Sequence, residues 1–121
     1  GRNFPLVRPA DDVHIYIAEA RWLEANTPAG STIGMSGGGT AAYFMADRTL
    51  VNLDGLINST DYFQQVKNGR GREAVDGFGL DYVYGNAYLL TSSNPYYNTL
   101  KDRLTPLGMM NDQTLFRYAN P

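Results

Sequence analysis

The alternation of helix-like and strand-like segments constrains the fold of this chain more than any other feature of its sequence. From residue 11 to residue 103, segments with apolar residues at helical spacing alternate with short apolar runs that are bounded by turn-forming residues. Strands separated by helices usually pair in parallel, and the connecting helices then cover both faces of the sheet. The pattern therefore predicts an α/β fold.

The first helix is expected to begin near Asp11 and Asp12, which can act as its N-cap and first-turn acid. Its apolar stripe consists of Val13, Tyr16, Ile17, Ala20 and Leu23. Asn26-Thr27-Pro28 ends the helix, because proline disfavours helical geometry in the residue before it. Residues 1–10 form a lead-in segment, and Gly1 is of the kind that tag cleavage leaves behind. Residues 11–121 are then expected to form a single domain.

Three apolar runs predict the strands of the parallel part, namely Ser31–Ser36, Thr49–Leu53 and Leu80–Tyr84. The helices expected between and after them span residues 40–45, 59–66, 72–76 and 94–103. Thr40 is expected to cap the first of these helices, and Ser59 or Thr60 the second. Asn94-Pro95 opens the last one, with proline in the first turn.

The end of the chain predicts a β-hairpin. Residues 104–110 and 113–118 flank Asn111-Asp112, a two-residue turn of the type that joins antiparallel strands. Pro106 cannot donate a backbone hydrogen bond, so the first hairpin strand belongs at an edge. The complete expectation is a small three-layer α/β domain, with a mainly parallel sheet, an antiparallel C-terminal hairpin and helices on both faces.

Composition excludes several function classes. The 121 residues carry 10 basic and 12 acidic side chains, a net charge of -2, which argues against a nucleic-acid partner. The one basic cluster is Lys67, Arg70 and Arg72, interleaved with Gly69 and Gly71, and its simplest interpretation is a solvated loop. No apolar run approaches the roughly 20 residues that span a bilayer.

Residues suited to metal binding and nucleophilic catalysis are scarce. The chain has no cysteine and a single histidine, His14, which excludes thiolate and histidine-rich metal sites. The spacing of Asp76 and Asp81 does not indicate a paired-carboxylate site, and no nucleophile elbow accompanies His14. We therefore assign no catalytic residue, no metal ligand and no cofactor.

A glycine turn forms the first candidate binding site. Gly37, Gly38 and Gly39 lie between a strand and a helix, where backbone N–H groups can face a phosphate. Asp54 follows at the end of the next strand, where dinucleotide-binding folds carry their ribose-binding acid. The other interpretation is a tight turn whose glycines permit close packing.

Asn52, Asp54 and Asn58 form the second candidate site, at the carboxyl end of a strand where open α/β sheets bind ligands. Their amides and carboxylate could hydrogen-bond sugar hydroxyls. Equally, Asp54 and Asn58 could cap local turns through bonds to the backbone.

Tyrosines form the third feature, because five of the nine fall within a short stretch: Tyr82, Tyr84, Tyr88, Tyr96 and Tyr97. A ring with a polar tip suits sugar stacking, a partner surface or a membrane boundary, and we take Tyr84 and Tyr88 as candidate contacts. Core packing explains the same residues.

Five segments carry a resemblance to a known family, namely Ala18–Pro28, Thr32-Ile33-Gly34-Met35, Tyr43-Phe44 with Arg48, Val51–Asn58 and Asp81-Tyr82-Val83. They resemble the soluble tail of bacterial GT-C superfamily glycosyltransferases, multi-pass proteins related to protein mannosyltransferases and lipid A aminoarabinose transferases. The same plan resembles the soluble domain of oligosaccharyltransferase catalytic subunits. Residues 37–39 depart from the polar or aromatic residues usual at that turn.

The resemblance implies a cap domain of a larger membrane protein, on the extracytoplasmic (periplasmic) side of the cell membrane. Its partners would be the protein's own membrane-embedded domain, a polyprenyl-phosphate-linked sugar and the acceptor of that sugar. Catalytic acids of the family lie in loops between membrane helices, and those loops have no counterpart in this sequence. Two alternatives remain open: a small nucleotide- or sugar-phosphate-binding module, and a non-catalytic structural or interaction domain.

Overall fold

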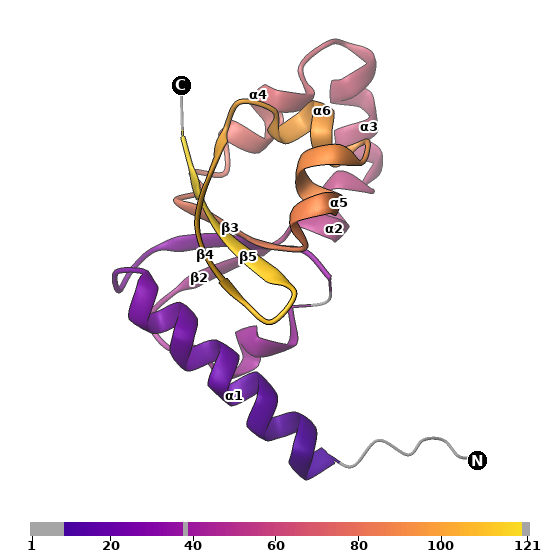
Figure 1. The fold of residues 1–121 in the computed structure, drawn as a ribbon. Helices are drawn as coiled ribbons and strands as arrows, with labels where there is room; N and C mark the ends of the chain where they lie inside the picture. The colour runs from indigo at the N-terminus through magenta and orange to yellow at the C-terminus, as the bar shows by residue number, and fades with distance from the viewer. Residues whose placement is uncertain (1–8, 38, 120–121) are drawn as a thin grey trace, which may run out of the picture.

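The computed structural model describes residues 9–37 and 39–119 (Figure 1). The elements in chain order are α1 (Pro9–Asn26), β1 (Thr32–Met35), the 3₁₀ helix η1 (Thr40–Phe44), β2 (Thr49–Asn52), α2 (Leu53–Ile57), α3 (Thr60–Lys67), α4 (Gly71–Asp76), β3 (Tyr82–Gly85), α5 (Ala87–Ser92), α6 (Tyr96–Leu100), β4 (Leu104–Met110) and β5 (Gln113–Tyr118). Eleven residues lie outside this description, namely 1–8 in the expected lead-in segment, 38 in the glycine turn and 120–121 at the end of the chain.

The described strands form one mixed sheet in the order β2-β1-β3-β5-β4. β1 pairs in parallel with β2 on one side and with β3 on the other. β5 pairs antiparallel with both β3 and β4. The predicted α/β class, with a parallel part extended by an antiparallel hairpin, is therefore confirmed.

One face of the sheet is covered by α1 and η1. Leu23 of α1 packs against Ile33 and Met35 of β1, Tyr84 of β3 and Leu115 of β5, all of them buried. Arg48 holds the end of α1 in place, because its guanidinium donates to the carbonyl oxygens of Glu24 and Thr27. Basic donors commonly satisfy the last carbonyls of a helix in this way.

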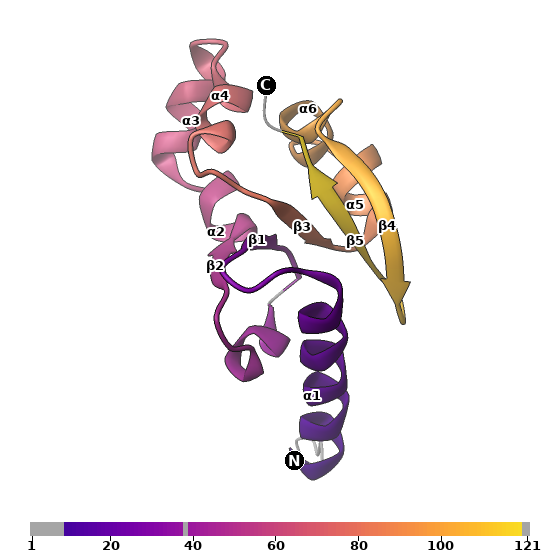
Figure 2. The ribbon, with the colours of Figure 1, turned by 90° about the vertical axis from the view of Figure 1, so that its left-hand side faces the viewer.

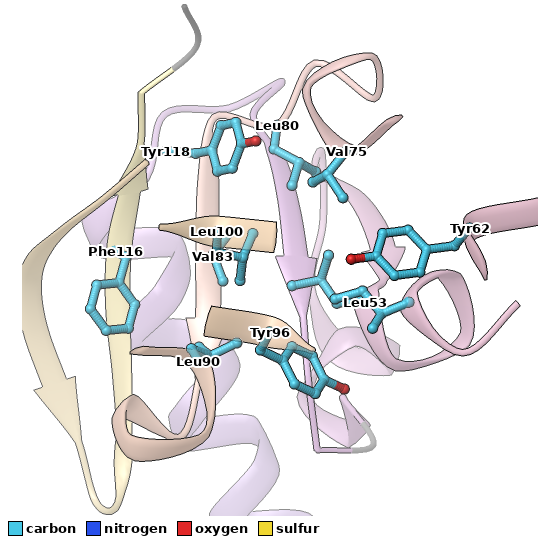
Figure 3. Close-up of a cluster of buried hydrophobic side chains, with 11 residues drawn as sticks. Leu53, Tyr62, Val75, Leu80, Val83, Leu90, Tyr96, Leu100, Phe116 and Tyr118 are labelled. Atoms are coloured by element: carbon cyan, nitrogen blue, oxygen red, sulfur yellow. The ribbon is translucent and has the colours of Figure 1, made fainter. Parts of the chain in front are cut away.

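The opposite face of the sheet is covered by α2 to α6. Val83 of β3 lies near the centre of this core, between residues of the helices and residues of β5 (Figure 3). The buried side chains packed there are Leu53, Ile57, Tyr62, Val75, Leu80, Val83, Leu90, Tyr96, Leu100, Phe116 and Tyr118. Apolar side chains thus fill the space on both sides of one sheet, which makes the three layers that the sequence predicts.

The observed helix caps and bounds agree only in part with those predicted from the sequence. The Ser59 hydroxyl accepts the N–H of Tyr62 at 3.1 Å, as a cap of α3 should. Thr40 is not a cap, because η1 is preceded by Gly39 in the left-handed conformation with no side-chain cap. α6 ends at Leu100 and so is shorter than the expected 94–103. α5 was not predicted; the Asn86 side chain caps it by accepting the N–H of Leu89 at 3.0 Å.

The C-terminal hairpin agrees with the prediction in both strands and in its turn, where Asn111 has φ 57°. β4 lies at the edge of the sheet, and the register shifts between Pro106 and Gly108. Asp76 of α4 accepts hydrogen bonds from Arg103 and from the Tyr118 hydroxyl. These bonds tie the hairpin to the helical layer.

The molecule is elongated, with α1 at one end and α3, α4 and α6 at the other (Figures 1 and 2). The N-terminal part of α1 reaches beyond the sheet in both views, and Val13 and Ile15 on it are 37% and 52% exposed. Across residues 9–37 and 39–119, no helix has the length and apolar character that crossing a bilayer requires.

Candidate functional site

After the parallel strands β1 and β3, the chain turns toward opposite faces of the sheet. After β1 it passes to η1, on the α1 face, and after β3 it passes to α5, on the other face. The two strands are neighbours, so their connections diverge at the carboxyl edge of the sheet. Open α/β sheets bind ligands where connections diverge in this way. We take this position as the candidate functional site.

A crevice of about 260 Å³ opens at this position, and we call it the switch crevice. It is bounded by α1, by the turn after β1, by β3 and by the tip of the hairpin. Its walls are formed by Ile15, Tyr16, Glu19, Met35, Ser36, Gly37, Gly39, Thr40, Tyr84, Asn111, Asp112 and Gln113. Three of the residues that the sequence singles out, Gly37, Gly39 and Tyr84, therefore meet in one place.

Tyr84 contributes a buried phenol to the crevice wall. Its side chain is 2% exposed, and its hydroxyl donates a hydrogen bond to the carboxylate of Glu19. Burial and, after it, the Glu19 carboxylate raise the pKa of Tyr84 far above that of a free phenol. The ring also lies 6.2 Å from that of Trp22. Tyr84 is thus a neutral donor in a fixed orientation, and Glu19 keeps lone pairs for another partner.

Asp54 connects the glycine turn to the helical layer. Its Oδ2 accepts the N–H of Gly37 at 2.8 Å, and its Oδ1 accepts the hydroxyl of Tyr96. Burial is the main cause that raises the pKa of Tyr96, and the bond to Asp54 adds to it. The glycine turn and Asp54, the two candidate motifs of the sequence, therefore meet, but the hydrogen bond between them uses the groups that a ligand would need. Asp54 acts here as a clamp on the turn.

Asn52 and Asn58 form local bonds around α2. The Asn52 side chain is the N-cap of α2 and accepts the N–H of Gly55 at 3.1 Å. Asn58 donates its amide to the carbonyl oxygen of Asp54 at 2.8 Å. This geometry favours the capping interpretation of Asn58, and it makes Asn52, which the sequence analysis took only as a sugar contact, the cap of α2.

Positive backbone φ angles account for two of the glycines. Gly37 has φ 75° and Gly39 has φ 57°, a region that side chains with a Cβ rarely adopt. Gly38, the third glycine of the candidate phosphate turn, lies outside the described residues.

Ser36 and Gly85 face each other at the ends of β1 and β3. A Cβ built on Gly85 would overlap the Ser36 hydroxyl and lie 3.2 Å from Leu90 Cδ1, so the contact requires glycine. Ser36 is 5% exposed, and its Oγ has no hydrogen-bond partner within the described part of the chain. It is a buried polar atom at the edge of the crevice.

The tyrosines do not share one surface. Tyr84 and Tyr96 are buried, whereas Tyr88 on α5 is 72% exposed and stands outside the crevice. Core packing thus explains part of the cluster, as the sequence allowed. The described residues contain no group of carboxylates and imidazoles able to hold a metal ion.

Sequence reasoning missed Glu19 and the hairpin tip as parts of the site. Glu19 stands next to Ala20 of the apolar stripe, and a carboxylate at that border was the available signal. Asn111 and Asp112 were assigned only to a turn, and Gln113 only to a strand. Their approach to α1 depends on the order of strands in the sheet, which periodicity does not reveal.

Comparison with known proteins gives a match to a family model. The sequence model described as "Domain of unknown function (DUF8728)" matches residues 10–118, nearly the whole chain. No curated protein and no solved structure matches the chain.

Proposed function

The chain belongs to the DUF8728 family, and we propose that it is the extracytoplasmic cap domain of a polytopic membrane glycosyltransferase. The parent enzyme uses a polyprenyl-phosphate-linked sugar. The cap helps to position the donor or the acceptor beside a membrane-embedded catalytic part. The GT-C resemblance of residues 12–84 motivates this proposal.

The switch crevice is the observation that carries the proposal. Its walls combine the Glu19 carboxylate, the Tyr84 phenol and the side chains of residues 111–113. Carboxylates, amides and phenols are the groups that hydrogen-bond sugar hydroxyls. At about 260 Å³ the crevice is smaller than the 300–1,000 Å³ typical of sites for drug-sized ligands. It suits one sugar unit better than a whole nucleotide.

The adjoining part of α1 supports contact with a neighbouring domain. Ile15 and Tyr16 line the crevice, and Val13 and Ile15, on the N-terminal part of α1 that extends from the body, are 37% and 52% exposed. Exposed apolar side chains beside a polar crevice are what an interdomain contact needs. The GT-C resemblance implies that the domain in contact with this surface is the membrane-embedded part of the same protein.

The internal bonds of Asp54 weigh against the nucleotide-binding alternative. A ribose-binding acid needs free acceptor atoms, but both oxygens of Asp54 already accept hydrogen bonds. A phosphate-binding turn needs free N–H groups, but that of Gly37 is donated to Asp54. We therefore retain the cap as the proposed function.

Sugar transfer by the full-length protein tests the proposal. Reconstituted in liposomes with a polyprenyl-phosphate sugar, Glu19→Gln and Gln113→Ala should raise KM by about tenfold and change kcat little, as expected when binding alone is weakened. Tyr88→Ser, on α5 outside the crevice, should leave both constants unchanged. A full-length protein without several membrane-spanning helices before Arg2 would contradict the proposal, as would turnover by the isolated chain.

A further inference from the structure

The helices α3, α4 and α6 lie together at one end of the molecule (Figures 1 and 2). Residues of these helices line a second and larger cavity. Its volume is about 680 Å³, and its walls come from α3, the α3–α4 turn, α4, the segment before α6, α6 itself and the segment after it. We call it the α4–α6 cavity. It takes in Arg72, Gly69 and Gly71 from the basic cluster of the sequence, whose simplest interpretation was a solvated loop.

Arg72 has unused donor capacity in this cavity. Its Nη2 donates to the carbonyl oxygen of Lys101 at 2.6 Å, which anchors the guanidinium. Its Nε is buried and has no hydrogen-bond partner among the described residues. Leaving a buried charged donor unpaired is costly, so such a group calls for an acceptor.

The other cation of the cavity is already paired. Arg103 donates to both oxygens of Asp76, at 3.0 and 2.9 Å, with both side chains mostly buried. This ion pair raises the pKa of Arg103 and lowers that of Asp76. The charge of Arg72 is only the smallest of the causes that lower the pKa of Asp76. Among the described residues, Arg72 is therefore the cation on this wall that has no ion-pair partner.

Two amides line the same cavity as Arg72. Asn94 and Asn98 line the cavity and are exposed to solvent. Glu73 also lines it and is exposed, and its negative charge opposes that of Arg72. An anion here would thus gain a fixed guanidinium and neutral amides, with one carboxylate reducing its affinity.

We propose that the α4–α6 cavity binds the phosphoryl group of a small phosphorylated ligand. Arg72 contacts the phosphoryl oxygens through its guanidinium, because a planar guanidinium matches their geometry and only Nη2 of this group has a hydrogen-bond partner among the described residues. Asn94 and Asn98 contact the remainder of the ligand, since the volume exceeds what a phosphate ion fills. The site is separate from the switch crevice and does not depend on the proposed cap function.

Calorimetric titration of the chain provides the test, with inorganic phosphate, pyrophosphate, glucose 1-phosphate and glucose as probes. Saturable binding of glucose 1-phosphate but not of glucose is expected. Arg72→Gln should weaken binding by about tenfold or more, the effect of one charge-assisted bond. Glu73→Gln should strengthen it. The matched control is Arg70→Gln, which removes the same charge two residues away, where the guanidinium bonds Gln65 and does not line the cavity.

Two further measurements cover loss of folding and the source of the phosphoryl group. Asn98→Ala changes an exposed side chain, so it should weaken glucose 1-phosphate binding without lowering the unfolding temperature. Cosedimentation with phosphatidylglycerol vesicles distinguishes a lipid headgroup from a free ligand; Arg72-dependent capture there assigns the site to a headgroup. Equal losses in Arg72→Gln and Arg70→Gln, or no saturable binding to any phosphate probe or vesicle, would overturn the proposal.

Discussion

The carboxylate of Asp54 accepts the backbone N–H of Gly37 at 2.8 Å, across 17 residues of sequence. This bond fixes the turn after β1 against the first turn of α2. The Tyr96 hydroxyl adds a second bond from α6 to the same carboxylate. Three segments that bound the carboxyl edge of the sheet are thus held by one side chain, which makes it the first target for mutation.

Replacement of Asp54 by asparagine should destabilise the domain by about 2 kcal/mol. One of the two acceptor oxygens becomes a donor, and hydrogen bonds to charged groups contribute about 1.5–3 kcal/mol each. Urea unfolding measures the change, and the amide of Gly37 should lose hydrogen-exchange protection. Asp102→Asn is the control, because Asp102 is exposed with φ 67°, which asparagine tolerates. Equal stability of the two variants would refute the clamp.

Replacement of Gly85 by alanine should cost about 1–3 kcal/mol, the usual effect of overpacking. The new Cβ would meet the Ser36 hydroxyl and Leu90. Ser36→Gly should recover part of this loss in the double variant, which a double-mutant cycle measures. Gly77→Ala is the matched control: its φ is -65°, and its Cβ would lie an ordinary 3.5 Å from the nearest atom. Absence of coupling between positions 36 and 85 would contradict the predicted contact.

Stability should fall in acid because of Asp76. The Arg103 guanidinium lowers the pKa of Asp76 in the folded chain, so the unfolded chain binds the proton more tightly. The stability from this ion pair is complete above the unfolded pKa and is lost as the pH falls through the folded pKa. Asp76→Asn should lose about 3 kcal/mol at neutral pH, as expected for a mostly buried pair, and less in acid. Denaturant midpoints from pH 7 to pH 2 test this, with the exposed Asp61→Asn as control.

Stability should also fall in alkali because of Tyr84. Burial and the Glu19 carboxylate raise the pKa of Tyr84 in the folded chain, whereas a tyrosine in the unfolded chain ionises near pH 10. A raised pKa contributes stability that is present below the unfolded value and is lost as the pH rises above it. Tyr84→Phe should therefore show a shallower decline above about pH 10 in thermal unfolding. The exposed Tyr88→Phe should decline as the unmodified chain does; a matching decline in Tyr84→Phe would count against this assignment.

The sequence predicts the parts of the fold whose signals are local. Strand and helix periods distinguish the parallel part from the hairpin, and Asn111-Asp112 marks the turn where the structure has it. α5 was not predicted, although the Asn86 side chain that caps it was a local signal in the sequence. α2 is missed as a helix because it follows β2 directly, without a loop.

The candidate site is less predictable, since its contacts join distant segments. Glycine and aspartate motifs indicate the right edge of the sheet, yet the bond between Gly37 and Asp54 turns a predicted ligand site into a structural contact. Glu19 and Tyr84 are 65 residues apart in sequence. They meet only because β3 lies beside β1 in the sheet and α1 covers the face that Tyr84 belongs to. The same limit applies to Arg72, because other residues that line its cavity come from α6 and from the segments before and after it.

Pro106 sets a limit on the width of the sheet. At the outermost strand it removes the one backbone donor that an additional strand would need there, and the shift in register up to Gly108 bends the same stretch. Leu107 and Met109 expose apolar side chains at that edge. With a complete row of backbone donors beside them, the edge would favour pairing with a strand of another molecule. The proline thus protects this edge against aggregation by removing one backbone hydrogen-bond donor.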